Sequence, residues 1–260
     1  LLLHPFGWWL GSDGDVPVET VRVAAIQGSV DQGEKWDAAR REEILSRYLA
    51  LSRDAAREAD WIVWPETAVP GLVEQDTPMR GRIASLARES GASLIVGGMG
   101  VDVDWQARRF SAFYDSAFLF DPDGNLTDRY DKTHLVPFGE YFPVLPKVRE
   151  WMRMMSLPHR DLAAGADEQD LIRTGGGLEL AVAICYEDAY GAEQLYALPD
   201  ATILINVSND AWFGDSIAPH QHLQFARMRA LEAGREAVRA TNNGISAFIN
   251  HRGAVVQTVP

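Results

Sequence analysis

Short apolar runs recur along the whole chain, and this pattern constrains the fold more than any other feature of the sequence. Each run is rich in β-branched residues and ends at polar or turn-forming residues, which is typical of strands. Where every position of a run is apolar, the strand is expected to be buried on both faces. The runs begin at Val21, Trp61, Ser93, Ala112, Leu180, Thr202 and Ile245.

Between several of these runs, apolar residues recur at the spacing of an amphipathic helix. This spacing predicts helices over residues 36–59, 80–90 and 221–238. Strands that alternate with helices indicate an α/β domain built in layers. A PDG turn at residues 122–124 and consecutive glycines at residues 175–177 separate further elements.

The chain is long enough for one large hydrophobic core. Its 260 residues lie near the upper limit of what a single core serves, so one domain is expected. The opening sequence LLLHPFGWWLG is apolar but much shorter than the ~20 residues of a membrane-spanning helix. We therefore expect residues 1–20 to be a linker or the tail of a preceding membrane region. Residues 21–260 are expected to form the domain, truncated at its C-terminus because the sequence stops inside a strand-like run.

The charge balance and the cysteine count argue against several classes of function. A net charge of -13 disfavours a surface that tracks nucleic-acid phosphates, so no nucleic-acid partner is expected. The single cysteine, Cys185, excludes an internal disulfide and multi-cysteine zinc or iron-sulfur sites. His220 and His222 lack a third ligand nearby, and surface or polar-core positions suit them better than metal binding. We expect neither a metal ion nor another cofactor.

Residues 141–165 do not follow the alternation of strands and helices. Prolines interrupt this segment, yet it contains large apolar residues that include Trp151, Met154 and Met155. Long apolar loops are usually functional, and methionine side chains adapt to varied apolar partners. The alternative, a short helix packed in the core, is about equally consistent with the sequence.

Cys185 lies where an apolar strand-like run ends and the polar sequence YED begins. In α/β sheets, reactive groups are presented to a crevice at such strand ends. Glu66 after the run IVWP and Lys132 after LTDRYD occupy comparable positions. Taken singly, each has an ordinary explanation: a buried free cysteine, a carboxylate that caps a turn, and a solvated lysine.

Taken together, these three side chains make a chemically sensible set. A thiol with a pKa of ~8.5 is mostly protonated at neutral pH, so a base must remove its proton. Glu66 suits that role if burial raises its pKa from ~4.3, which we expect. The Lys132 ammonium and the backbone N–H of Tyr186 would then stabilise the oxyanion of a tetrahedral intermediate.

The motifs around these residues resemble the Glu-Lys-Cys triad of the nitrilase superfamily, in its usual chain order. They are WPET at Glu66, YDKTHLVPFGEY at Lys132 and ICYED at Cys185. The resemblance extends from VRVAAIQG to the end of the chain. It implies a four-layer α-β-β-α sandwich, with residues 21–260 as a nitrilase-like catalytic domain.

Further motifs are similar to one branch of that superfamily, the catalytic domain of the apolipoprotein N-acyltransferase family. They are QGSVDQGEKWD, HLVPFGEY, SNDAWFGDSIAPHQHLQFARMRALE and RATNNGISAFI. This branch implies transfer of an acyl chain from a phospholipid donor, through a Cys185 thioester, to the N-terminal amine of a diacylglyceryl lipoprotein acceptor. It also implies a membrane partner, with the catalytic domain on the periplasmic face of the bacterial inner membrane.

The same branch implies supporting roles for residues near the triad. Glu140 in FGEY matches a family carboxylate and would orient Lys132 or the surroundings of Cys185. Tyr186 and Glu187 match positions that support the oxyanion or handle substrate.

Three aromatic or apolar residues are candidate substrate contacts. Trp36 matches a position that the family links with substrate handling. In the apolar segment 141–165, Trp151 and Met155 would face the bilayer and admit acyl chains to the thiol.

Two other classes of function stay open. A soluble carbon-nitrogen hydrolase of the same superfamily would use water in place of the lipoprotein amine. A binding domain that kept the fold and lost catalysis is disfavoured, because Glu66, Lys132 and Cys185 are all present.

Overall fold

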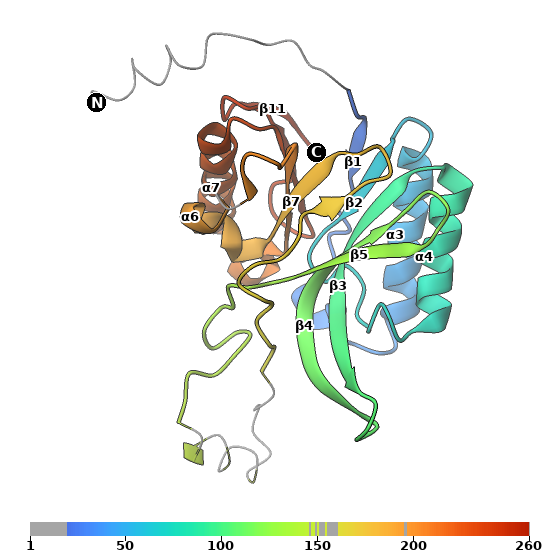
Figure 1. Cartoon of the computed structure of the whole chain (residues 1–260), viewed down its shortest axis with the longest axis vertical. Coiled ribbons are helices and arrows are strands. Elements are labelled where there is room, and N and C mark those ends of the chain that lie inside the picture. The colour runs from blue at the N-terminus through green and yellow to red at the C-terminus, as the bar shows by residue number, and fades with distance from the viewer. Residues whose placement is uncertain are drawn as a thin grey trace.

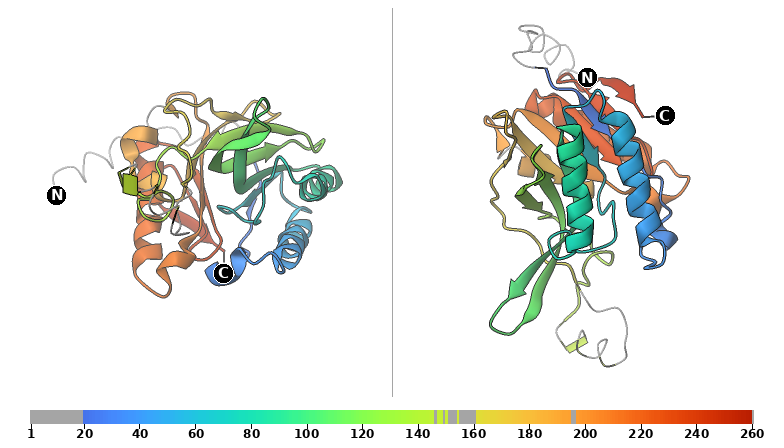
Figure 2. Two further views of the ribbon diagram at one scale, coloured as in Figure 1. Left: turned by 90° about the horizontal axis from the view of Figure 1, so that it is seen from below. Right: turned by 90° about the vertical axis from the view of Figure 1, so that its right-hand side faces the viewer.

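Two β-sheets pack face to face at the centre of the molecule, and helices cover the outer face of each sheet (Figure 1 and Figure 2). The structure is a computed structural model that describes residues 20–259 apart from residues 146, 149, 151–153, 155–160 and 195–196. Each sheet has parallel strands at its centre or on one side and antiparallel strands beyond them.

The first sheet has the strand order β1-β2-β3-β4-β5, which is also the chain order. Strands β1, β2 and β3 pair in parallel, whereas β4 and β5 are added antiparallel. Every residue of β2 is buried, as expected for a strand covered on both faces. The strands are β1 (Val23–Ala25), β2 (Trp61–Trp64), β3 (Ser93–Asp104), β4 (Arg109–Phe120) and β5 (Leu126–Asp131).

The second sheet has the order β11-β10-β9-β8-β7-β6. Strands β7, β8 and β9 pair in parallel, and the outer strands pair antiparallel. The strands are β6 (Ile172–Arg173), β7 (Glu179–Ile184), β8 (Ile203–Ser208), β9 (Ala237–Thr241), β10 (Ala247–Ile249) and β11 (Val255–Thr258).

Three long helices form the outer layers. Helices α3 (Arg41–Ala55) and α4 (Thr77–Ser90) lie side by side on the first sheet, and α7 (Ala218–Ala233) covers the second (Figure 2). Helix α4 has clear end signals: Asp76 accepts a hydrogen bond from the Met79 amide at 2.9 Å, and Gly91 ends the helix in the left-handed region. The short helices are α2 (Gln32–Lys35), α6 (Gly191–Gln194) and the 3-10 helices η1 (Cys185–Ala189) and η3 (Asp210–Phe213).

The buried apolar residues form separate layers that match this arrangement. One cluster, which includes Ile83, fills the space between α3, α4 and the first sheet. A second, which includes Ile95 and Ile205, lies between the two sheets. A third, which includes Leu204 and Ala230, lies between the second sheet and α7. The predicted four-layer α-β-β-α sandwich is therefore confirmed.

The helix predicted over residues 221–238 is wrong at its C-terminal end. Helix α7 ends at Ala233, because Gly234 has a φ of 61° and closes the helix in the left-handed region. The apolar residues that follow belong to the buried strand β9. Apolar spacing alone cannot separate the last turn of a helix from the first residues of a fully buried strand.

The segment 141–165 does not pack as a core helix in the part that the structure describes. Leu145 is 74% exposed and Met154 is 66% exposed. Trp151 and Met155, the candidate substrate contacts, lie outside the described residues. Within the described part of the chain, none of the helices combines the length and the apolar character that crossing a membrane requires.

Candidate active site

Three strand ends bring Glu66, Lys132 and Cys185 into one cluster, in which Glu66 and Lys132 are buried and Cys185 is half-buried. Glu66 follows β2 and Lys132 follows β5 on the first sheet, whereas Cys185 follows β7 on the second sheet. The Glu66 carboxylate is a hydrogen-bond partner of the Cys185 thiol, and Lys132 Nζ lies 3.4 Å from Glu66 Oε1. Each sheet thus contributes a different part of one site.

The ammonium of Lys132 is fully buried and surrounded by carboxyl groups. Its Nζ lies 2.5 Å from Glu140 Oε1 and 3.9 Å from Asp115 Oδ2. Burial alone would lower the pKa of Lys132, but the negative charges around it, that of Glu66 above all, raise the pKa well above its ordinary value. Lys132 is therefore a fixed positive charge beside the thiol.

Glu66 is held as a carboxylate although it is almost completely buried. Burial would raise its pKa, but the Lys132 charge, a hydrogen bond with Asp115 and the Lys35 charge lower the pKa below its ordinary value. The expectation that burial raises the pKa of Glu66 is therefore wrong, because it left these neighbours out. An ionised Glu66 is ready to accept a proton, and the adjacent Lys132 stabilises the charges that move during the transfer.

Two members of the cluster, Lys35 and Asp115, were not identified from the sequence. Lys35 at the end of α2 is buried, and its Nζ donates to the Glu66 carbonyl oxygen at 3.0 Å. Burial lowers the pKa of Lys35 to about 8 against the opposing effect of the Glu66 charge. Burial and the nearby Glu66 charge raise the pKa of Asp115 well above its ordinary value, so this carboxyl group is protonated and shares a hydrogen bond with Glu66.

A sequence signal for both residues existed. Asp115 is the only charged residue in the apolar run AFYDSAFLF, and Lys35 is one of only three lysines in the chain. A lone charged residue inside a buried strand is expensive to keep and therefore indicates a functional or paired position.

Cys185 combines a strained backbone with a protonated thiol. Its φ of 53° lies in the left-handed region, at the point where β7 passes into η1. Burial and the Glu66 charge raise the pKa of the thiol, and these effects outweigh the Lys132 charge and a hydrogen bond with Ser208. Attack by the sulfur must therefore be coupled to transfer of the thiol proton, and Glu66 is the acceptor at hand.

Glu187 ties the turn at Cys185 to the segment that follows Lys132. Its carboxylate accepts hydrogen bonds from the amides of Ile184 at 2.7 Å, Thr133 at 2.6 Å and His134 at 3.1 Å. Because these donors come from both sheets, Glu187 fixes the position of the thiol relative to the ammonium. It is buried, and its hydrogen bonds within the described part of the chain go to neither Lys132 nor Cys185, which favours a supporting over a substrate-binding role.

The other predicted residues differ in their distance from the buried cluster. Glu140 contacts Lys132 directly, and its second oxygen accepts a hydrogen bond from the Val136 amide at 2.8 Å. Tyr186 and Trp36 are exposed, next in sequence to Cys185 and Lys35 respectively. These two aromatic side chains are accessible to solvent, and a contact with substrate stays a prediction for both.

The carboxyl groups were also tested as a metal site. Glu66, Asp115 and Glu140 each offer an oxygen atom, and these atoms lie within 4.8 Å of one another. Lys132 Nζ lies among them, 3.4 Å from an oxygen of Glu66, 3.9 Å from one of Asp115 and 2.5 Å from one of Glu140. An ammonium thus already balances this donor set, and we assign no metal ion to it.

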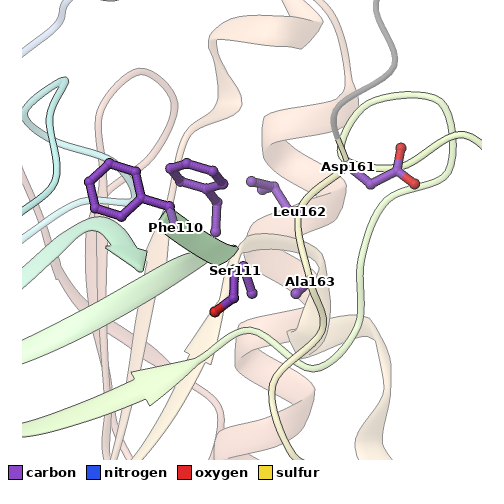
Figure 3. A pocket seen from close by; sticks show the side chains of 7 residues that line it. Phe110, Ser111, Asp161, Leu162 and Ala163 are labelled. Atoms are coloured by element: carbon purple, nitrogen blue, oxygen red, sulfur yellow. The ribbon is translucent and has the colours of Figure 1, made fainter. Parts of the chain in front are cut away.

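An open hollow of about 500 Å³ lies on another part of the first sheet (Figure 3). It is bounded by the start of β4, including Phe110 and Phe113, and by residues 161–163. The Ala163 amide donates to the Phe113 carbonyl at 2.7 Å and holds the two segments together. None of the residues that line the hollow belongs to the cluster around Lys132.

A four-layer α-β-β-α sandwich with a glutamate, a lysine and a cysteine at its strand ends defines the nitrilase class of thiol enzymes. The carbon-nitrogen hydrolase family profile matches residues 22–260, and the chain belongs to that family. The fold is similar to that of a carbon-nitrogen hydrolase from Helicobacter pylori G27, with a TM-score of 0.69, 16% identity and coverage of 92% of this chain and 85% of the other. It is also similar to that of an amidase from Nesterenkonia sp., with a TM-score of 0.64, 19% identity and coverage of 95% and 89%.

Sequence relatives point to one branch of the family. The chain is 38% identical over 253 residues to a protein of Methylococcus capsulatus named apolipoprotein N-acyltransferase, which covers 97% of this chain and 47% of that protein. It is 41% identical over 243 residues to a protein of the same name from Pseudomonas syringae pv. tomato, covering 92% and 46%. The chain thus spans about half the length of the curated relatives it matches.

Proposed function

We propose that this chain is the catalytic domain of an apolipoprotein N-acyltransferase, with Cys185 as the nucleophile. The observation that carries the proposal is the 38% to 41% identity, along almost the whole chain, to proteins with that name. The buried cluster of Glu66, Lys132 and Cys185 supplies the chemistry that such a transfer requires.

In the first half of the reaction, the Cys185 sulfur attacks the ester carbonyl of a phospholipid while the thiol proton moves to Glu66. The Lys132 charge, which acts on the thiol in the resting site, stabilises the oxyanion that develops on the carbonyl oxygen. The ester C–O bond then breaks, the leaving alkoxide takes the proton from Glu66, and a lysophospholipid departs. The acyl chain remains on sulfur as a thioester.

In the second half, the neutral N-terminal amine of a diacylglyceryl lipoprotein attacks the thioester. A C–N bond forms and the C–S bond breaks. The proton lost by the amine passes through Glu66 to the Cys185 sulfur, which restores the resting thiol. No redox step and no external cofactor are needed to balance either half.

Exposed aromatic side chains occur close in sequence to the site residues and support an acyl donor taken from a membrane. Trp36, Tyr186, Phe138 and Trp212 each lie within a few residues of a member of the buried cluster or of its supporting residues. Phe138 is 70% exposed and Trp212 is 68% exposed. Since a chain of net charge -13 gains no attraction from anionic headgroups, contact with the bilayer would depend on such apolar side chains.

We further propose that the domain works at the periplasmic face of a bacterial inner membrane. This placement agrees with the proposed substrates, because both the phospholipid donor and the diacylglyceryl acceptor are anchored in a bilayer. Trp151 and Met155 remain proposed contacts for the acyl chains.

The test uses the complete gene product that carries this chain, incubated in detergent micelles with a phospholipid of known acyl composition. We expect peptide mass spectrometry to find the mass of one acyl chain on Cys185, and none in a Cys185→Ser variant, which keeps the size of the side chain. Addition of a synthetic S-diacylglyceryl-cysteine peptide should discharge the thioester and give an N-acylated peptide.

The same experiment separates the proposal from its main rival. If no thioester forms from phospholipid while a small amide is hydrolysed, the chain is a carbon-nitrogen hydrolase in which water replaces the amine. If the Cys185→Ser variant still acylates the peptide, Cys185 is not the nucleophile.

A further inference from the structure

A second buried polar cluster lies behind Cys185, and the reaction described above does not use it. Its charged members are His222 on α7, Asp188 on η1, Asp210 on η3 and Arg239 on β9, and all four are buried. Charged groups are rarely kept in a core unless they are paired, and breaking such a set is costly. The position of this cluster indicates a role in holding the turn at Cys185.

Both ring nitrogens of His222 face oxygen atoms that can only accept a hydrogen bond. Nδ1 lies 2.7 Å from Asp210 Oδ1, and Nε2 lies 3.0 Å from the carbonyl oxygen of Cys185. A neutral imidazole carries one N–H and could satisfy only one of these acceptors. The doubly protonated imidazolium satisfies both, so the geometry requires His222 to carry a positive charge.

The surrounding charges balance an imidazolium. Asp188 Oδ1 lies 3.1 Å from His222 Nε2, and Arg239 contacts Asp188 Oδ2 at 3.2 Å and Asp210 Oδ2 at 3.0 Å. The carboxylates of Asp188 and Asp210 therefore face two cations, the His222 imidazolium and the Arg239 guanidinium. Arg229, on the same helix as His222, is paired with Glu232 at 2.8 Å and donates to the backbone carbonyl of Asp188 at 3.4 Å.

The electrostatic balance agrees with this protonation state. Burial and the Arg239 charge lower the pKa of His222, but Asp188 and Asp210 outweigh them and raise it to about 9. His222 therefore stays protonated at neutral pH and loses its charge only as the pH rises through about 9.

The Cys185 carbonyl is the link between this cluster and the nucleophile. Besides His222, Asn206 Nδ2 donates to the same oxygen at 3.3 Å, and Asn206 Oδ1 is in turn held by Arg239. Cys185 needs such support because its φ of 53° is unfavourable for a residue with a side chain. His222 and Asn206, which are themselves held by Asp210 and Arg239, thus fix the orientation of the Cys185 carbonyl.

We propose that His222 is a positioning residue that is kept as an imidazolium and fixes the left-handed turn at the nucleophile by donating its Nε2–H to the Cys185 carbonyl oxygen. This positioning role depends on the proposed function in one respect, namely that Cys185 is the reacting group. His222 touches neither the thiol nor the substrate through any contact of the described residues, so it acts through the backbone of Cys185.

Nitrogen-15 NMR of the histidine side chains tests the charge state without any substitution. From pH 6 to pH 8, where free histidine with a pKa of ~6.5 loses its proton, both nitrogens of His222 should stay protonated. Its deprotonation should appear only near pH 9. Assignment uses the resonance that disappears in a His222→Gln variant. A neutral imidazole at pH 7.5 would overturn the proposal.

The contact with the Cys185 carbonyl is tested by the rate of alkylation of Cys185 by iodoacetamide, followed by peptide mass spectrometry. In His222→Gln, the side-chain amide can reach the position of Nε2, whereas in His222→Asn it reaches only the position of Nδ1. We expect His222→Asn to slow alkylation by about 10-fold or more, since it removes a charged hydrogen bond, and His222→Gln to recover part of that loss.

The matched control is His220→Gln, the same change at an exposed position of the same helix, which should leave the rate unaltered. Thermal melting identifies any variant that fails to fold.

Folded His222→Asn and His222→Gln variants that both react at the wild-type rate would overturn the proposal. If the wild-type chain shows the expected His222 behaviour but forms no acyl thioester, the proposed function fails and the positioning role stands.

Discussion

The carboxyl groups of Glu66, Asp115 and Glu140 lie around one ammonium, yet their surroundings differ. Lys132 and Lys35 keep Glu66 ionised, whereas burial beside that negative charge keeps Asp115 protonated. The proton that Asp115 shares with Glu66 makes the pair titrate as a unit. Glu66 can therefore stay ionised, ready to accept the thiol proton, without a second carboxylate beside it.

Replacement of Glu66 by Gln should remove the proton acceptor while keeping the shape of the side chain. We expect kcat for acyl transfer to fall by about 10²- to 10⁴-fold, the usual contribution of a general base. The rate of thioester formation from phospholipid, measured in a single turnover, checks this. The control is Glu42→Gln, the same change on the exposed side of α3. A Glu66→Gln variant with more than a tenth of the wild-type rate would contradict the assignment.

At the scale of elements, the position of Glu66 depends on the packing of β3 against the chain that follows β2. Gly97 in β3 accepts a hydrogen bond from the Ala68 amide at 3.0 Å and lies against Pro65 and Glu66. A Cβ atom at Gly97 would meet the Pro65 carbonyl oxygen, with Glu66 Cα only 2.8 Å away. Because these neighbours are backbone atoms, they cannot turn aside as a flexible side chain could.

A Gly97→Ala variant should therefore displace Glu66. We expect a loss of about 1–3 kcal/mol in the free energy of unfolding, as in other overpacked sites. The rate of thioester formation should fall about 10²-fold, since small displacements of a catalytic group have effects of that size. Denaturant titration and single-turnover kinetics measure the two effects.

Gly81→Ala in α4 is the control for that change. Nothing lies within 4 Å of a Cβ atom at Gly81, and the residue has no left-handed φ. Alanine inside a helix is favoured over glycine by about 0.5–1 kcal/mol, so this variant should be more stable and equally active. If Gly97→Ala behaves in the same way, the close approach of β3 does not position Glu66.

At the scale of the whole molecule, the apolar core between the sheets sets the distance between the base and the nucleophile. Ile205 lies in that core, whereas Ile83 lies in the core between α4 and the first sheet. Both side chains are completely buried, and truncation of either to Ala should cost about 2–5 kcal/mol. Only Ile205→Ala should also slow alkylation of Cys185, because only this cavity lets one sheet shift against the other.

Equilibrium unfolding and the alkylation rate of the folded variants distinguish the two positions. Equal alkylation rates in Ile205→Ala and Ile83→Ala would show that the spacing of the sheets does not control the reactivity of the Cys185 thiol.

Much of this architecture could be predicted from the sequence, because fully apolar runs such as WIVW and LAVAI report burial directly. The boundary between α7 and β9 was misplaced, since Ala237 and Val238 in β9 continue the apolar spacing of the helix beyond Gly234. Within the site, Glu66, Lys132 and Cys185 could be predicted because each follows a strand-like run at the point where polar residues begin. Lys35 and Asp115 were missed although the lone charge of Asp115 in an apolar run was a local signal, because the partners that give both residues their roles lie far away in the chain.

The division of the site between two sheets also sets an order of assembly during synthesis. All residues of the first sheet precede Lys132, whereas the turn at Cys185 is completed only by segments as late as β9. The hydrogen bond from the Tyr48 hydroxyl to Asn242, at 3.1 Å, joins residues 194 positions apart and can form only after Asn242 has been made. A chain still emerging from the ribosome therefore has its base before its thiol, and the thiol at first lacks the later segments that hold its turn. The support of the turn by Asn206, His222 and Arg239 can therefore form only after β9 has been made.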